Sequence, residues 1–149
     1  MHLLALGARV TACERNPAML RLIQDALARA ASDETIHTTV RRALDERFSL
    51  VADDARCALR AQRGFHAVLI DPMHPDVGRT AAVTREMRIV REVVGDDPDA
   101  AALLAAAIEA GPRTVVKLPR RAPPLLPAPL PAGSVMGRAL RWDYYLPIR

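Results

Sequence analysis

Short apolar runs alternate along this 149-residue chain with longer stretches in which apolar residues recur every three or four positions. The runs are typical of buried strands, and the recurring positions are typical of helices. We expect strands over residues 8–13, 48–52, 65–70, 113–118 and 140–148. We expect helices over residues 3–6, 16–31, 40–44, 55–61, 78–94 and 99–110. This alternation predicts an α/β fold with a mostly parallel sheet and helices on both faces, in which the last two strands pair antiparallel.

Glycine, asparagine and proline mark the expected ends of several elements. Gly7 is expected to stop the first helix, and Asn16-Pro17 to start the second, with Asn16 as its N-cap. Residues 119–131 hold six prolines, too many for the interior of a helix or strand, so they are expected to form an extended loop. No internal repeat or second domain is evident, so residues 1–149 are expected to form one domain.

Composition narrows the possible partners only a little. Half of the residues are hydrophobic but 3% are aromatic, so the core is expected to be aliphatic. The net charge of +4 permits a polyanionic partner such as RNA. Lys117 is the only lysine, and a chain rich in arginine and alanine can reflect the base composition of its gene, so the charge does not by itself indicate nucleic-acid binding.

The two cysteines and the lack of long apolar runs are typical of a cytoplasmic protein. Cys13 and Cys57 do not form a Cys-x-x-Cys pair and are interpreted as reduced thiols of a cytoplasmic protein. No apolar run approaches the ~20 residues of a membrane-spanning helix. We therefore expect no membrane partner, and no cluster of residues predicts a metal ion.

Acidic residues follow three of the expected strands: Glu14, Asp53-Asp54 and Asp71. Ligands of open α/β sheets bind outside the carboxyl ends of the strands, so acids at these ends suit the ribose and the adenine of an adenosine-containing ligand. Each acid also has a structural interpretation. Glu14 could be a surface carboxylate near the Asn16 cap, and Asp53 or Asp54 could cap the helix that follows.

Asp71 opens the most informative motif of the chain, Asp71-Pro72-Met73-His74-Pro75. A carboxylate and a carbonyl at or before a proline can accept both N–H groups of an exocyclic amine, while the ring at position 74 packs on the base. This chemistry is typical of methyltransferases that act on adenine or guanine amines. The alternative is a strand end followed by an ordinary proline turn.

One expected part of such a fold is missing from the sequence. These folds hold the cofactor at a glycine-rich turn after the first strand. Here Gly7 stands alone, and no strand is expected before Leu3. We therefore expect the chain to begin just after that loop.

The Asp71 motif also occurs in a longer similarity. Residues 68–95 join it to Glu86-Met87-Arg88, a combination that is specific although either part alone would be weak. Further similar stretches are Gly7-Ala8-Arg9-Val10 with Glu14-Arg15, residues 115–119, residues 122–125 and residues 141–146. Over almost its whole length the chain resembles the ribosomal small subunit methyltransferase J family.

The resemblance implies a Rossmann-like class I methyltransferase fold that lacks its first strand and glycine-rich loop. It implies transfer of a methyl group from S-adenosylmethionine to the N2 amine of a guanine in 16S rRNA, free or within the small ribosomal subunit. It implies that five residues bind the cofactor: Glu14, at the ribose, Arg15, Asp53, Asp54 and Asp71. The implied catalytic residues, around the target amine, are Asp71, Pro72 and His74.

The chain departs from the family pattern in three places. It has no glycine-rich turn with the Arg-Asp pair that follows it, it has His74 where the family usually has Phe or Tyr, and it has Asp53-Asp54 where the family often has small hydroxyl residues. Two other functions stay open. The chain could be a vestigial or RNA-binding member of the fold that does not hold cofactor. It could also be a nicotinamide-dependent oxidoreductase, although no catalytic Tyr-Lys or His-Asp arrangement supports this.

Overall fold

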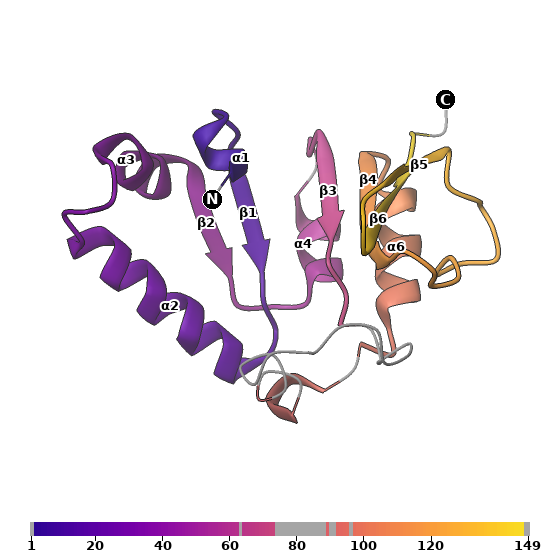
Figure 1. Ribbon diagram of the computed structural model, residues 1–149, viewed down its shortest axis with the longest axis horizontal. Helices are drawn as coiled ribbons and strands as arrows, with labels where there is room; N and C mark the ends of the chain where they lie inside the picture. The colour runs from indigo at the N-terminus through magenta and orange to yellow at the C-terminus, as the bar shows by residue number, and fades with distance from the viewer. Residues whose placement is uncertain (1, 63, 74–88, 90–91, 96, 148–149) are drawn as a thin grey trace. The chain divides into compact units, whose positions relative to one another are not determined.

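The computed structural model describes residues 2–62, 64–73, 89, 92–95 and 97–147. They belong to two compact units, Met1–Ala58 and Leu59–Arg149, each of which is described by itself (Figure 1). The helix expected over residues 78–94 lies mostly outside the described residues. No described helix is both long and apolar enough to cross a membrane.

The first unit contains a two-stranded parallel sheet. Its elements are α1 (His2–Ala5), β1 (Val10–Cys13), α2 (Pro17–Ser32), α3 (Thr38–Arg47), β2 (Phe48–Val51) and the start of α4 (Ala55–Ala61). Strands β1 and β2 pair in register from Val10 with Phe48 to Cys13 with Val51, so both end at the same edge. The predicted helix ends are confirmed, because Gly7 has φ +91° and the Asn16 side chain accepts hydrogen bonds from the first turn of α2.

The second unit contains a four-stranded mixed sheet in the order β3-β4-β6-β5. Its elements are β3 (Ala67–Ile70), α6 (Ala100–Glu109), β4 (Arg113–Pro119), β5 (Gly133–Met136) and β6 (Leu140–Tyr145). Strand β3 is parallel to β4, and β6 is antiparallel to both β4 and β5. The α/β class and the antiparallel pairing of the last two predicted strands are confirmed. The described four-stranded sheet is mixed and not mostly parallel, because one of its three strand pairs is parallel, and β5 is an edge strand that was not predicted.

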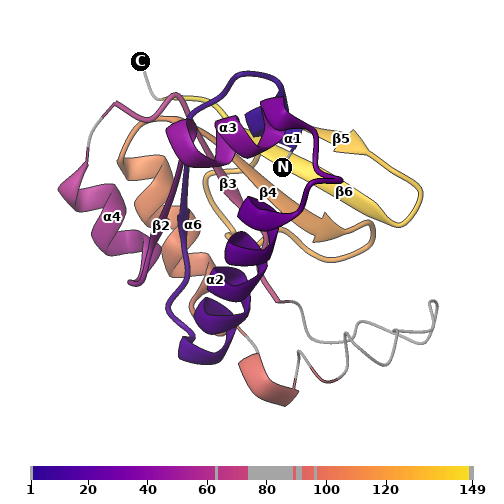
Figure 2. The ribbon, with the colours of Figure 1, turned by 90° about the vertical axis from the view of Figure 1, so that its left-hand side faces the viewer.

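The core of the second unit lies between α6 and one face of this sheet (Figure 2). Leu104 and Ala107 of α6 are fully buried, as are Val116 and Leu118 of β4. Every second residue of β4 from Thr114 is buried, because alternate side chains of a strand face the same side. Leu59, Ile70 and Tyr145 complete this core.

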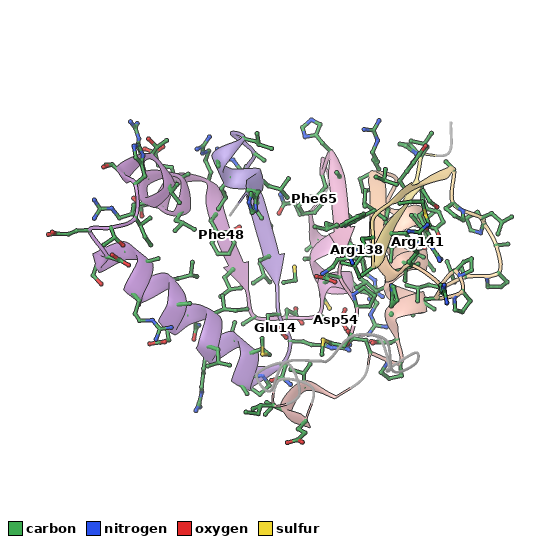
Figure 3. The ribbon with its side chains drawn as sticks, in the orientation of Figure 1. Glu14, Phe48, Asp54, Phe65, Arg138 and Arg141 are labelled. Atoms are coloured by element: carbon green, nitrogen blue, oxygen red, sulfur yellow. The ribbon has the colours of Figure 1, made fainter. Side chains whose placement is uncertain are left out.

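A buried ion pair closes one end of this core. Arg141 donates to Asp143 at 2.9 Å, and the Asp143 side chain is 1% exposed. Arg141 also donates to the carbonyls of Arg120 and Ala122 at the start of the proline-rich loop (Figure 3). Ser134 of β5 donates to the same Asp143 carboxylate at 2.6 Å, so the pair joins β5, β6 and the loop.

Candidate active site

In the first unit, Glu14 follows β1 directly and lies at the carboxyl end of both strands (Figure 3). Its backbone N–H donates to the carbonyl of Val51, which continues the β1–β2 pairing by one residue. Its side-chain Oε1 accepts from the N–H of Asn16 at 2.7 Å. This bond ties the half-buried Glu14 carboxylate to the start of α2, close to the Asn16 cap.

The Asp54 carboxylate is held mainly by Arg56, two residues further along the chain. Its Oδ1 accepts from the backbone N–H of Arg56 at 2.8 Å, which caps α4, and its carboxylate pairs with the Arg56 guanidinium at 2.6 Å. Arg15 lies further away, at 3.5 Å. The hydrogen bond from Arg56 is the main cause that holds the pKa of the Asp54 carboxyl well below its usual range. Asp54 thus has the capping role that the sequence left open.

The neighbouring Asp53 accepts fewer hydrogen bonds than Asp54. Asp53 is exposed, and its Oδ1 accepts from the N–H of Asp54 at 2.7 Å. The two aspartates also influence β1, because burial first, and then their negative charge, raises the pKa of the Cys13 thiol. The carboxyl end of β1 and β2 is therefore an acidic edge on which one carboxylate is committed to a helix cap.

This acidic edge fits the hydroxyl and amino groups of an adenosine. The second oxygens of Glu14 and Asp53 make no hydrogen bond to the described part of the chain. Both are acceptors, which suits ribose hydroxyls and an adenine amine as donors. Arg15 follows Glu14 in the chain, is exposed and pairs with Asp54. Among the described residues, no group of acids, histidines and cysteines could hold a metal ion.

In the second unit, Asp71 follows β3 and pairs with a residue of the neighbouring strand. Lys117 of β4 donates from Nζ to Oδ2 of Asp71 at 2.8 Å. The parallel register that aligns Ile70 with Val116 places Asp71 beside Lys117. The only lysine of the chain thus pairs with Asp71.

The turn after Asp71 is held by the burial of Pro72 and by a hydrogen bond from Met73. Pro72 is buried, while Asp71 itself is exposed. The N–H of Met73 donates to Oδ2 of Asp97 at 2.8 Å. Asp97 was not predicted as a site residue, and it lies shortly before α6. His74 and Pro75 lie outside the described residues.

The predicted site residues thus fall into two groups. Glu14, Arg15, Asp53 and Asp54 lie together in the first unit. Asp71 and Pro72 lie in the second, with Lys117 and Asp97 around them. Each group is described within its own unit.

Comparisons with known proteins give a consistent result. Residues 2–147 match a family model described as "Putative SAM-dependent methyltransferase". The chain is 43% identical over 147 residues to the ribosomal RNA small subunit methyltransferase J of Laribacter hongkongensis, covering 97% of this chain and 50% of that protein. It is 38% identical over 150 residues to the protein of the same name from Brucella anthropi, covering 97% of this chain and 68% of that protein.

A solved structure is similar over nearly the whole chain. The crystal structure of the SAM-dependent methyltransferase NGO1261 from Neisseria gonorrhoeae matches with a TM-score of 0.65 and 31% identity. The match covers 98% of this chain and 59% of that one. The chain therefore spans about half to two thirds of the length of these relatives.

Proposed function

The chain belongs to the ribosomal RNA small subunit methyltransferase J family of S-adenosylmethionine-dependent methyltransferases, and from this premise we propose that it methylates the N2 amine of a guanine in 16S rRNA. The observation that carries the proposal is the Asp71-Pro72 turn at the carboxyl end of β3, held by Lys117 and Asp97. Family membership argues against the nicotinamide-dependent alternative. An rRNA substrate also implies that the protein acts in the cytoplasm.

The Asp71 carboxylate can orient the target amine without taking its proton. Oδ2 is engaged by Lys117, so Oδ1 is the acceptor that faces an N–H of the guanine. A carbonyl of the Pro72 turn would accept the second N–H, and His74 would pack on the base. Two such acceptors favour a pyramidal nitrogen with its lone pair aimed at the donor, and positioning of this kind supplies much of the rate in group transfer.

The acidic edge of the first unit would hold the adenosine part of the cofactor. Glu14 Oε2 would accept from the ribose hydroxyls and Asp53 from the adenine amine, while Asp54 keeps α4 in place by its cap. When bound, S-adenosylmethionine supplies an electrophilic methyl group. That methyl group would be transferred to the amine nitrogen that Asp71 and the Pro72 turn hold.

Titration calorimetry with S-adenosylmethionine tests the cofactor half of the proposal. Binding in the micromolar to millimolar range supports it, and no heat at millimolar ligand would mean that this chain is the vestigial or RNA-binding alternative. The assay is informative because the sequence has no glycine-rich turn.

Methyl transfer to 16S rRNA or small subunits tests the target half. Asp71→Ala is expected to reduce transfer by about a hundredfold or more, because it removes an acceptor for the target amine. Asp45→Ala, at an exposed acid of α3, is the control and should retain full activity. Cofactor binding by Asp71→Ala combined with undiminished transfer would refute the role of Asp71.

A further inference from the structure

One face of the four-stranded sheet has no covering element among the described residues. Alternation along β4 directs Val116 and Leu118 toward α6, and Val115 and Lys117 to the opposite side. The neighbours of these two residues on β6 lie on that same opposite side. We call it the Trp142 face, and its apolar residues are Leu69, Val115, Val135, Trp142, Tyr144 and Leu146.

The Trp142 face is apolar and open. Leu69 is 58% exposed, Val135 60% and Leu146 49%, whereas core residues on the other face are nearly all below 10%. Arg113 borders the face, which forms a hollow of about 410 Å³. Contiguous exposed apolar surface of this kind marks an interaction site in a folded protein.

The aromatic rings of Trp142 and Tyr144 line the floor of the hollow. A side chain at Gly133 would overlap the Tyr144 phenol, and one at Gly137 would lie 3.1 Å from the Trp142 ring. The rings therefore occupy the space that larger residues would fill on and beside β5. Such a floor suits the packing of another layer of secondary structure.

We propose that the Trp142 face docks an apolar-faced polypeptide segment from the part of the relatives' sequences that this chain does not match. That part makes up half of the Laribacter relative and about two fifths of the Neisseria structure. Parallel strand pairs such as β3 and β4 occur mainly in α/β folds, where both faces of the sheet are covered, and β3 pairs on one side only among the described strands. A polypeptide can satisfy both the apolar face and a strand edge.

RNA is the less suitable occupant. The most exposed side chains of the face are aliphatic. Lys117, opposite Trp142 in the strand register, is paired with Asp71, and Arg113 lies only at the border of the hollow. Base-stacking surfaces instead combine aromatic rings with cations that face the phosphates. The inference goes beyond the proposed function and does not depend on it, because its test measures binding and not methyl transfer.

Trp142 is the only tryptophan of the chain, so it reports on this face alone. The 149-residue chain is labelled with 5-fluorotryptophan and titrated with the unmatched segment of the Laribacter relative, produced separately with any tryptophan replaced by phenylalanine. We expect a saturable shift of the single ¹⁹F resonance at a one-to-one ratio. If the segment does not fold alone, it is joined to the chain in the relative's order, and Trp142 is then expected to be protected from acrylamide.

Two neighbouring residues of β5 supply a matched pair of variants. Val135 is 60% exposed on the Trp142 face, and Met136 is 54% exposed on the opposite side. Val135→Asp is expected to weaken binding by about tenfold or more, since it places a charge in an apolar interface, while Met136→Asp should change it less than about twofold.

Several results would overturn the proposal. One is the absence of any shift or protection with the segment in either arrangement. Equal effects of Val135→Asp and Met136→Asp would show that the segment binds elsewhere. A resonance that depends on the concentration of the chain alone would assign the face to a second copy, and a larger shift with single-stranded RNA than with the segment would assign it to RNA.

Discussion

The two units of this protein bury their apolar residues to different extents. In the second unit, α6 and the sheet enclose a core with Leu104 and Val116 at 0% exposure. In the first, Leu4 and Ala43 are the buried apolar residues among those described, and α2 has none. The second unit therefore has the core of a stable domain, whereas the first depends more on local hydrogen bonds and caps.

The carboxylates of the two units differ in a related way. Asp54 accepts from a backbone N–H and a guanidinium two residues away, and this commits it to structure. Asp71 has one ion pair with a residue from the next strand and keeps an oxygen for a ligand. Asp54, whose carboxylate already accepts several hydrogen bonds from the chain, is therefore less available to a substrate than Asp71.

The largest expected effect comes from the buried pair of the second unit. Asp143→Ala leaves Arg141 buried without its partner, and we expect the free energy of unfolding to fall by ~3–5 kcal/mol. Urea unfolding followed by Trp142 fluorescence measures this. Asp25→Ala removes a pair with Arg29 in which both side chains are more than half exposed, and it should cost less than ~0.5 kcal/mol. Equal losses would show that the Arg141 pair is not buried in solution.

Truncation of a leucine in each unit tests the difference in burial directly. Leu104→Ala is expected to cost ~2–5 kcal/mol, because Leu104 is fully enclosed. Leu27→Ala on the partly exposed face of α2 should cost ~1 kcal/mol. Circular dichroism follows both units and Trp142 fluorescence follows the second. A Leu27 variant as damaging as the Leu104 variant would mean that the first unit buries α2 more deeply than described.

Local sequence signals predicted most of the elements, because their causes lie within a few residues. The Asn16 cap, the Gly7 stop and the span of α4 all depend on near neighbours. The edge strand β5 was not predicted, since its mostly exposed residues show no apolar alternation.

Contacts set by strand register were the part that the sequence did not reveal. Lys117 and Asp71 are 46 residues apart and meet because β3 and β4 pair in one particular register. Asp97 likewise reaches Met73 across 24 residues. The Arg141–Asp143 pair could have been predicted from the sequence, since residues two apart in a strand lie on the same face of the sheet.

Removal of the Asp54 carboxylate is expected to have a moderate effect on the first unit. Asp54→Ala deletes a helix cap and an ion pair, so we expect a loss of ~1–2 kcal/mol at pH 7. The folded pKa of Asp54 lies below its ordinary value of 3.8, so its contribution is complete above about pH 4 and is lost as the pH falls below it. Circular dichroism between pH 7 and pH 2 should show acid unfolding that is shallower in Asp54→Asn than in the unmodified chain.

A small effect on stability, and the clearest contrast with Asp54, is expected at Lys117. Its pair with Asp71 is 34% and 59% exposed, so Lys117→Met should change the free energy of unfolding by less than ~1 kcal/mol. If the pair orients Asp71 toward the target amine, the same variant should lower kcat for methyl transfer by roughly tenfold, and Lys117→Arg should restore part of it. A loss of stability without a change in kcat would reverse the assignment, because Asp71 would then be a structural carboxylate like Asp54.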